Sequence, residues 1–479
     1  MDPVRERQLF EDCPVIRAIV RLAVPTVVGQ IILVIYNLAD TFFIGLTGSD
    51  AMLTAVTVCM PAFMVLSAIS NLFGIGGASV ISRALGEQDR EKAKRTSTFS
   101  FWGCIGMTLL YSLAVWLFMD PFVDLLGGTN GAVHGYATGY LLCTVVIGGV
   151  ATAMNMLLAH LIRAEGRSVQ ASVGIALGGI LNVLLDPLFM FAVLPKGQET
   201  LGAAIATALS NLIAAVYFLI LVLAKRKTPS VIRLGRFTGA LKNGIPLDVL
   251  CAGLPAFLMT LLENISYAIL DKLMSLCGTQ MQAGIGVAKK VNMLAHCIVR
   301  GIAQGALPLI GYSFAAKKYR RMKHAVGLCT VFAVSAALMC MTANLLFSVP
   351  LIEIFIHNGA ESVGYGAKFL CILCIGSPFS ACAYTIISFF QATGKSLRSF
   401  LIAILRKGIL DIPLMFILNT ALPVYGIVWA TPIADLLCCG AALTLIGLFL
   451  KGCGDSQAAE HSRPAMRQDT FQEEMRRLA

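Results

Sequence analysis

The stretch VPTVVGQIILVIYNLADTFFIGL, residues 24–46, decides the fold class of this chain. Asp40 is its only charged residue. An α-helix of this length is about 34 Å long, enough to cross a hydrocarbon core about 30 Å thick. Lipid offers no partners to backbone N–H and C=O groups, and a helix satisfies them internally. We therefore interpret residues 24–46 as a transmembrane helix.

Similar apolar runs follow along the chain. Charged residues make up only 13% of it, against about 25% in soluble domains. The runs are continuous rather than alternating, which excludes a β-barrel. The sequence thus predicts an all-α integral membrane protein with twelve transmembrane helices. The eleven further spans are expected at 53–82, 97–119, 136–162, 170–193, 202–224, 249–275, 283–314, 325–349, 366–392, 399–421 and 425–450.

The charges of the connecting loops predict the orientation. Twenty Lys or Arg residues lie in the loops on one side, and a single one, Lys196, lies on the other. Basic loops stay on the cytoplasmic side, so both termini are expected there. The basic residues are scattered between apolar runs and form no stripe, which argues against nucleic acid as a partner. The basic-side loops are 83–95, 163–167, 225–242, 317–323 and 395–398.

An internal repeat divides the chain. The sequence IRAEGRS at 162–168 returns as FQATGKS at 390–396, and Pro25 and Pro255 are 230 positions apart. Six spans separate the equivalent positions, so the halves enter the membrane in the same direction and form parallel repeats, as transporters often do. The expected division is a cytoplasmic segment at 1–23, a six-helix bundle at 24–224, a basic linker at 225–248, a second bundle at 249–450 and a cytoplasmic tail at 451–479.

Polar residues in the spans of the first half suggest an ion site. Carboxylates in a membrane are costly and need a partner or a purpose. The cluster comprises Asp40 with Tyr36 and Asn37 one turn earlier, Asn182 with Asp186 one turn later, and Thr207. Hard oxygen ligands suit a small cation such as Na⁺, and a carboxylate pair can equally hold a proton. Hydrogen bonding between helices is the structural alternative.

The second half carries its own ionisable residues. Glu263 near the middle of its span is a candidate substrate or proton group, and Arg300 and Asp411 are further candidates for substrate binding or coupling. Arg406 and Lys407 are expected to pair with Asp411 or to reach the membrane surface.

Several motifs resemble the multidrug and toxin extrusion (MATE) family. They are NLADTFFIG at 37–45, GGASVISRALGEQDREKA at 76–93, RAEGRS at 163–168, NVLLDPLFMF at 182–191 and GAAIAT at 202–207. The resemblance covers residues 10–452 and is closest to the bacterial multidrug branch. It implies two six-helix bundles around a V-shaped central cavity. It also implies a cation site at Asp40, Asn182, Asp186 and Thr207. An acid that relatives carry in span 10 has no counterpart here.

The expected function is secondary active export of organic cations or drugs in exchange for H⁺ or Na⁺, by alternating access. No cofactor, and no metal beyond Na⁺ at the cation site, is expected. The protein would act as a monomer in the plasma membrane. The first alternative is a flippase for lipid-linked oligosaccharide or cell-wall precursors, which Arg300, Lys289 and Lys290 keep open. A membrane-embedded enzyme is the second, and no catalytic motif supports it.

Overall fold

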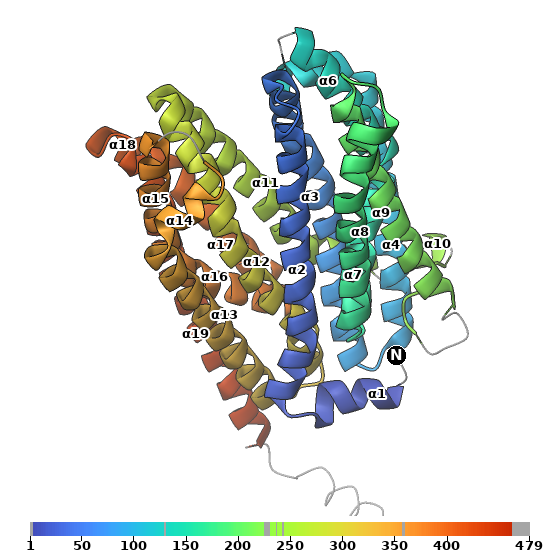
Figure 1. The fold of residues 1–479 in the computed structure, drawn as a ribbon. Helices are drawn as coiled ribbons and strands as arrows, with labels where there is room; N and C mark the ends of the chain where they lie inside the picture. Colours follow the sequence, from blue (N-terminus) through green and yellow to red (C-terminus); the bar gives the residue numbers. More distant parts are fainter. Residues whose placement is uncertain are drawn as a thin grey trace, which may run out of the picture.

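The computed structural model describes residues 3–128, 131–224, 230–235, 237–241, 244–356 and 360–461. Helices dominate throughout these ranges (Figure 1). The first half contains α2 (Val15–Gly45), α3 (Asp50–Gly86), α4 (Arg90–Leu117), α5 (Met119–Leu126), α6 (Gly131–Leu141), η2 (Leu142–Ile147), α7 (Gly149–Ala164), α8 (Ser168–Pro187), η3 (Leu188–Val193) and α9 (Glu199–Ala224). Here η denotes a π-helical segment.

The second half repeats this order. It contains α11 (Ile245–Cys277), α12 (Thr279–Ala315), α13 (Tyr319–Leu346), α14 (Ser348–Glu353), α15 (Ala360–Ile375), α16 (Ser377–Ala392), α17 (Ser396–Ile404), η4 (Leu405–Asp411), α18 (Ile412–Ala421) and α19 (Tyr425–His461). Three shorter segments lie outside the two bundles: α1 (Pro3–Arg7), η1 (Gln8–Asp12) and α10 (Phe237–Ala240).

The number of spans agrees with the prediction of twelve. Within the described ranges, nine helices are long and apolar enough to cross a bilayer, and two bent pairs raise the number to 11. The remaining predicted span, 399–421, is helical throughout as α17, η4 and α18. It contains Arg406, Lys407 and Asp411, and all three side chains are buried inside the protein rather than exposed to lipid.

The internal repeat is visible in the backbone. The first bent pair breaks by 50° between Ile147 and Gly149, and the second breaks by 43° between Ile375 and Ser377. The break points are therefore 228 positions apart. Left-handed residues repeat as well: Gln88 has φ 62° and Lys317, 229 positions later, has φ 56°. These matches fit two parallel copies of one six-helix unit.

Close contacts between the halves follow the same symmetry. A Cβ on Gly253 of α11 would lie 1.8 Å from the carbonyl oxygen of Leu72 on α3. In the other pair, a Cβ on Gly301 of α12 would lie 2.6 Å from the Cα of Val27 on α2. Leu72 and Gly301 are 229 positions apart. Glycine is needed at these crossings because each brings two helix backbones together.

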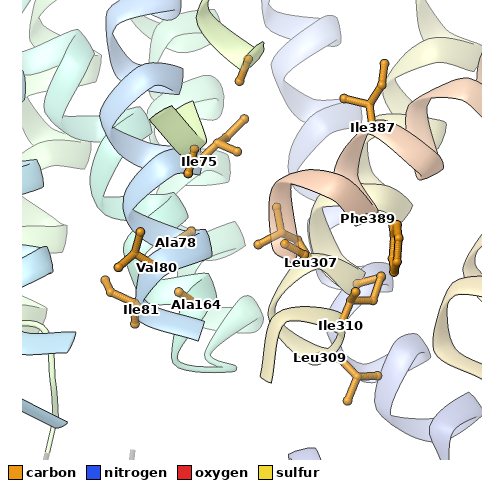
Figure 2. Packing of buried hydrophobic residues seen from close by; sticks show 14 of the residues in the cluster. Ile75, Ala78, Val80, Ile81, Ala164, Leu307, Leu309, Ile310, Ile387 and Phe389 are labelled. Atoms are coloured by element: carbon orange, nitrogen blue, oxygen red, sulfur yellow. The ribbon is translucent and has the colours of Figure 1, made fainter. Parts of the chain in front are cut away.

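The hydrophobic cores explain why the two bundles diverge in Figure 1. The largest core cluster includes buried residues of both halves, among them Ile75 and Ile81 of α3 and Leu307 and Ile310 of α12 (Figure 2). These side chains lie toward the ends that carry the basic loops. At the opposite ends each half has a separate core, around Val123 in the first half and around Phe369 in the second. The halves are thus joined at the basic end and separate at the other, which gives the predicted V.

The predicted domain boundaries stay predictions. Residues 225–229, 236 and 242–243 of the linker and 462–479 of the tail lie outside the described residues. The helices also extend beyond the predicted spans: α2 begins at Val15 and α19 continues to His461.

Candidate functional site

Three helices of the first half bring four of the predicted residues together. Asn182 and Asp186 are one turn apart on α8, and both are almost fully buried. The Asn182 amide Nδ2 donates to Oδ1 of Asp186 at 3.4 Å and to Oγ1 of Thr207 on α9 at 3.1 Å. Asp40 of α2, 6% exposed, places its carboxyl group within hydrogen-bonding reach of the Asp186 carboxyl group.

Small residues make this approach of α2 and α8 possible. A Cβ on Gly179 would lie 2.9 Å from Cγ2 of Ile32, and one on Gly29 would lie 3.4 Å from Oγ of Ser172. Larger side chains at either glycine would push the helices apart. The geometry of the carboxyl pair therefore depends on residues that carry no charge themselves.

The buried oxygen atoms of the cluster lack donors. Among the described residues, no hydrogen bond reaches Oδ1 of Asp40, Oδ2 of Asp186 or Oδ1 of Asn182. No Lys, Arg or His in the described ranges forms an ion pair with either aspartate. Two carboxylates cannot face each other in a low-dielectric interior without a proton or a cation between them. The arrangement is therefore chemically suited to a proton or a small cation.

Two tyrosines near this cluster interact with the carboxyl groups, whereas Asn37 does not. Tyr36 is buried on α2 and interacts electrostatically with both carboxyl groups. Asn37, by contrast, donates to the carbonyl oxygen of Leu33 at 2.7 Å, within its own helix. Tyr140 of α6, which the sequence analysis missed, also lies near Asp40 and Asp186. Tyr140 could not be singled out in the sequence because tyrosine is common in apolar spans.

A second missed feature extends the polar network behind Thr207. Asn211 donates to the carbonyl oxygen of Thr207 at 2.9 Å, and Asn155 of α7 donates to Oδ1 of Asn211 at 2.9 Å. Both asparagines lie in predicted spans, so the presence of a polar amide in an apolar run could have identified them. They fix the turn of α9 that carries Thr207.

The candidates of the second half form two ion-paired groups that meet at Tyr384, whose ring lies 5.5 Å from the guanidinium carbon of Arg300 and 4.7 Å from that of Arg406. Arg300 of α12 binds the Glu263 carboxylate of α11 and donates to the Tyr384 hydroxyl at 3.0 Å. In the second group, Asp411 accepts from Lys407 at 2.7 Å, from Ser266 at 2.6 Å and from Thr431 at 2.9 Å. Neither group contacts the Asp40 and Asp186 pair.

Lys407 pairs with Asp411, one of the two expected outcomes, and it does not reach the membrane surface. Arg406 pairs instead with Asp435 of α19, at 2.6 Å. Sequence spacing could not reveal this partner because Asp435 lies on another helix, 29 positions away.

Comparison with known proteins agrees with this architecture. The profile of the MatE family matches residues 25–188 and 255–417, one match in each half. The chain is 29% identical over 447 residues to "Multidrug export protein MepA" of Staphylococcus saprophyticus, covering 93% of this chain and 97% of that one. It is 28% identical over 449 residues to the protein of the same name from Staphylococcus aureus strain NCTC 8325 / PS 47, with the same coverage.

Solved structures show the same fold. One is described as the "Outward-facing conformation of a multidrug resistance MATE family transporter of the MOP superfamily"; it has a TM-score of 0.84 and 23% identity, over 94% of this chain and 98% of that chain. Another, "Crystal structure of MATE in the straight conformation", has a TM-score of 0.86 and 22% identity over the same shares. With both halves matched by the family profile and the twelve-helix fold shared, this chain belongs to the MATE family of membrane transporters.

Proposed function

We propose that the protein is a multidrug exporter that moves small organic, mainly cationic, molecules out of the cell in exchange for H⁺ or Na⁺. The observation that carries the proposal is the buried pair Asp40 and Asp186, in which one carboxylate oxygen of each residue has no hydrogen-bond partner among the described residues. Such a pair stores a proton or a cation, and releases it only when its surroundings change. The names of the relatives, multidrug export proteins, supply the substrate class.

The donor set leaves both coupling ions open. Two carboxylates, the Asn182 carbonyl oxygen and the Thr207 hydroxyl are hard oxygen ligands, which favour Na⁺ over softer metals. A proton shared between the carboxyl groups would satisfy the same pair. No further cofactor is required by this chemistry.

Alternating access follows from the joined and separated ends of the bundles. The present conformation is closed at the basic end and, with that end placed in the cytoplasm by the positive-inside rule, it is open to the outside. Rocking of one half against the other would expose the site to the cytoplasm. In this proposal both termini are cytoplasmic, the protein is in the plasma membrane, and one copy suffices.

The flippase alternative is less favoured by the charges of the second half. A lipid diphosphate would need several unpaired cations along its path. Of the three cations that keep this alternative open, Lys289 is bound to Asp271, and the charge of Arg300 is offset by Glu263. Only Lys290 has no ion pair among the described residues, and a single such cation does not provide a path for a diphosphate.

The test is transport in reconstituted vesicles. Proteoliposomes loaded with the organic cation ethidium should expel it when a H⁺ or a Na⁺ gradient is imposed, and one of the two gradients alone should suffice. Collapse of that gradient should stop the movement. Expulsion that is indifferent to both gradients would contradict ion exchange, and the absence of any ethidium movement would contradict drug export.

A further inference from the structure

The second half holds most of its buried cations in closed pairs. Arg406 and Asp435 are 2% and 3% exposed and lie 2.6 Å apart. Lys407 and Asp411 are 2% and 1% exposed and lie 2.7 Å apart. Nη1 of Arg406 has no hydrogen-bond partner among the described residues, but both pairs are enclosed by protein, so a ligand cannot reach them.

Arg300 differs from these cations. Only its Nη2 nitrogen makes hydrogen bonds, to Glu263 and to Tyr384. No described residue accepts from Nε or Nη1, and 32% of the side chain is exposed. The Tyr384 ring lies 5.5 Å from the guanidinium carbon and holds it in place. Nη1 of this fixed arginine is therefore left to donate a single charge-assisted hydrogen bond to an anion such as a carboxylate.

The free edge of Arg300 borders a cavity at the seam between the halves. Asn71 comes from α3 of the first half, whereas Glu263, Arg300, Gln304 and Tyr384 come from the second. The cavity is about 50 Å³ in volume, which is room for a carboxylate group rather than for a whole drug molecule. It would therefore take one end of a substrate whose remainder lies between the bundles.

Two further polar groups of the cavity complement such a ligand. Gln304 has a buried carbonyl oxygen without a hydrogen-bond partner among the described residues. Glu263, 12% exposed, presents a carboxylate beside the guanidinium. A positive and a negative group thus stand next to each other in one cavity, whereas the first half presents only the aspartate pair.

We propose that this cavity anchors zwitterionic substrates, with the carboxylate of the substrate on Arg300 and its cationic part directed toward Glu263. The proposal rests on the proposed export function and narrows it. The first-half aspartates bind the coupling ion, and the seam cavity selects drugs that carry both charges over drugs that carry only a positive one.

Rhodamine 110 and rhodamine 123 provide a matched pair of probes. Rhodamine 110 carries a free carboxylate beside its cationic ring system, and rhodamine 123 is its methyl ester. Binding to purified protein in nanodiscs is measured by fluorescence polarisation, so that it does not depend on transport. We expect Arg300→Gln to weaken rhodamine 110 binding by about tenfold, the value of a lost charge-assisted hydrogen bond. Binding of rhodamine 123 should stay equal or tighten, because Glu263 loses its competing cation.

Controls separate this role from a structural one. Lys290→Gln removes a cation from the same helix and should leave both dyes unchanged, and Arg300→Lys should restore part of the rhodamine 110 affinity. Should Arg300→Gln alone be unstable, the double variant Glu263→Gln/Arg300→Gln removes both charges and should still lose rhodamine 110 preferentially. Equal effects of Arg300→Gln on the two dyes, or no measurable binding of rhodamine 110 to the parent protein, would overturn the proposal. Normal charge-selective binding without gradient-driven export would instead refute the proposed function and leave this inference standing.

Discussion

The aspartate pair is the smallest unit on which the proposed coupling depends. Replacing either residue by asparagine keeps a hydrogen-bonding side chain of the same size and removes a buried charge. If the pair were structural, Asp40→Asn and Asp186→Asn would fold and transport normally. Under ion coupling, neither variant binds a proton, and both are poorer Na⁺ ligands. We expect each to lose gradient-driven ethidium export by at least tenfold at matched membrane levels.

Two comparisons sharpen this prediction. Asp186→Glu moves the carboxylate by one methylene and should keep partial activity. Asp120→Asn removes a carboxylate that is exposed on α5 and should export like the parent. Full activity in both buried asparagine variants would refute the coupling role of the pair.

Asp411, by contrast, is expected to stabilise the fold. Its carboxylate is the counter-ion of buried Lys407, so Asp411→Asn leaves that ammonium uncompensated. Breaking one side of a buried ion pair costs about 3–5 kcal/mol. We expect a lower thermal unfolding temperature in detergent for Asp411→Asn, and recovery of most of the loss in Lys407→Met/Asp411→Asn. If the double variant is as unstable as the single one, the cost does not come from the orphaned lysine.

At the scale of helices, glycines set the distance between the halves. A side chain at Gly253 cannot be accommodated by rotation of a neighbour, because it would meet the carbonyl oxygen of Leu72. We therefore expect Gly253→Val to separate α11 from α3, to lower thermal stability and to reduce export at least tenfold. Gly440→Val on α19 is the matched control, since a Cβ there has nothing within 4 Å. Equal behaviour of the two variants would show that the crossing tolerates separation.

The N-terminal segment closes the basic end across both halves. Glu6 binds Arg90 of the first half at 2.6 Å. The ring of Phe10 stacks on that of Tyr312 of the second half, with centroids 5.0 Å apart, and Glu11 accepts from the Tyr312 hydroxyl at 2.7 Å. This segment therefore favours the conformation that is closed at this end.

Loss of this contact should loosen the basic end. The probe is a single cysteine placed at buried Ser82 in a protein without native cysteines. We expect Phe10→Ala to raise the alkylation rate of this cysteine several-fold, compared with the same protein in which Phe10 is intact. Val4→Ala, at a residue that is 62% exposed, is the control and should change nothing. An unchanged rate in Phe10→Ala would mean that the segment does not hold the halves together.

The pH dependence of the Glu11 contact can be derived from its partners. Partial burial raises the pKa of Glu11, but hydrogen bonds from Lys318 and Tyr312 outweigh this effect and hold the pKa below its usual value. A lowered pKa in the folded state means that the contact is complete above the ordinary value of about 4.3 and is lost as the pH falls through the lowered one. At each pH, the alkylation rate of the Phe10→Ala protein is divided by the rate of the protein with Phe10 intact. This ratio should be the same at pH 6 and at pH 8.

The helices could be predicted from the sequence better than the contacts between them. Long apolar runs specify spans because lipid demands them, and Asp40 or Asp186 stands out in such a run for the same reason. The bends near Gly148 and Gly376 were not predictable, since glycine is frequent in membrane helices that stay straight. The Arg406 and Asp435 pair and the approach of Tyr140 to the aspartates depend on how separate helices pack. A single sequence does not encode that packing locally.

At the scale of the whole molecule, the proposed rocking of the bundles requires that the shared core come apart. One hydrophobic cluster joins the halves at the basic end, and two separate clusters occupy the other. The separate clusters keep each bundle rigid, so opening of the basic end has to occur within the shared one. Its seam runs between α3 and α12, where a Cβ on Gly311 would lie 3.1 Å from Cβ of Ser82.

A disulfide across this seam should therefore stop transport without harming the fold. The double variant Ser82→Cys/Gly311→Cys, in a background without native cysteines, places two Cβ atoms 3.1 Å apart, slightly closer than the separation of about 3.5–4.5 Å in a disulfide. The new Cβ at position 311 would also lie 3.1 Å from the carbonyl oxygen of Ala392, so both contacts require a small shift of α12. After oxidation we expect gradient-driven ethidium export to cease and substrate binding from the open side to persist, and reductant should restore export. A control pair inside the first half, Ser70→Cys/Ala153→Cys, joins helices that already contact each other, and oxidation should leave its export intact. Export at the parent rate by the fully cross-linked seam variant would show that the halves need not separate there, and rocking of the bundles would be refuted as the means of transport.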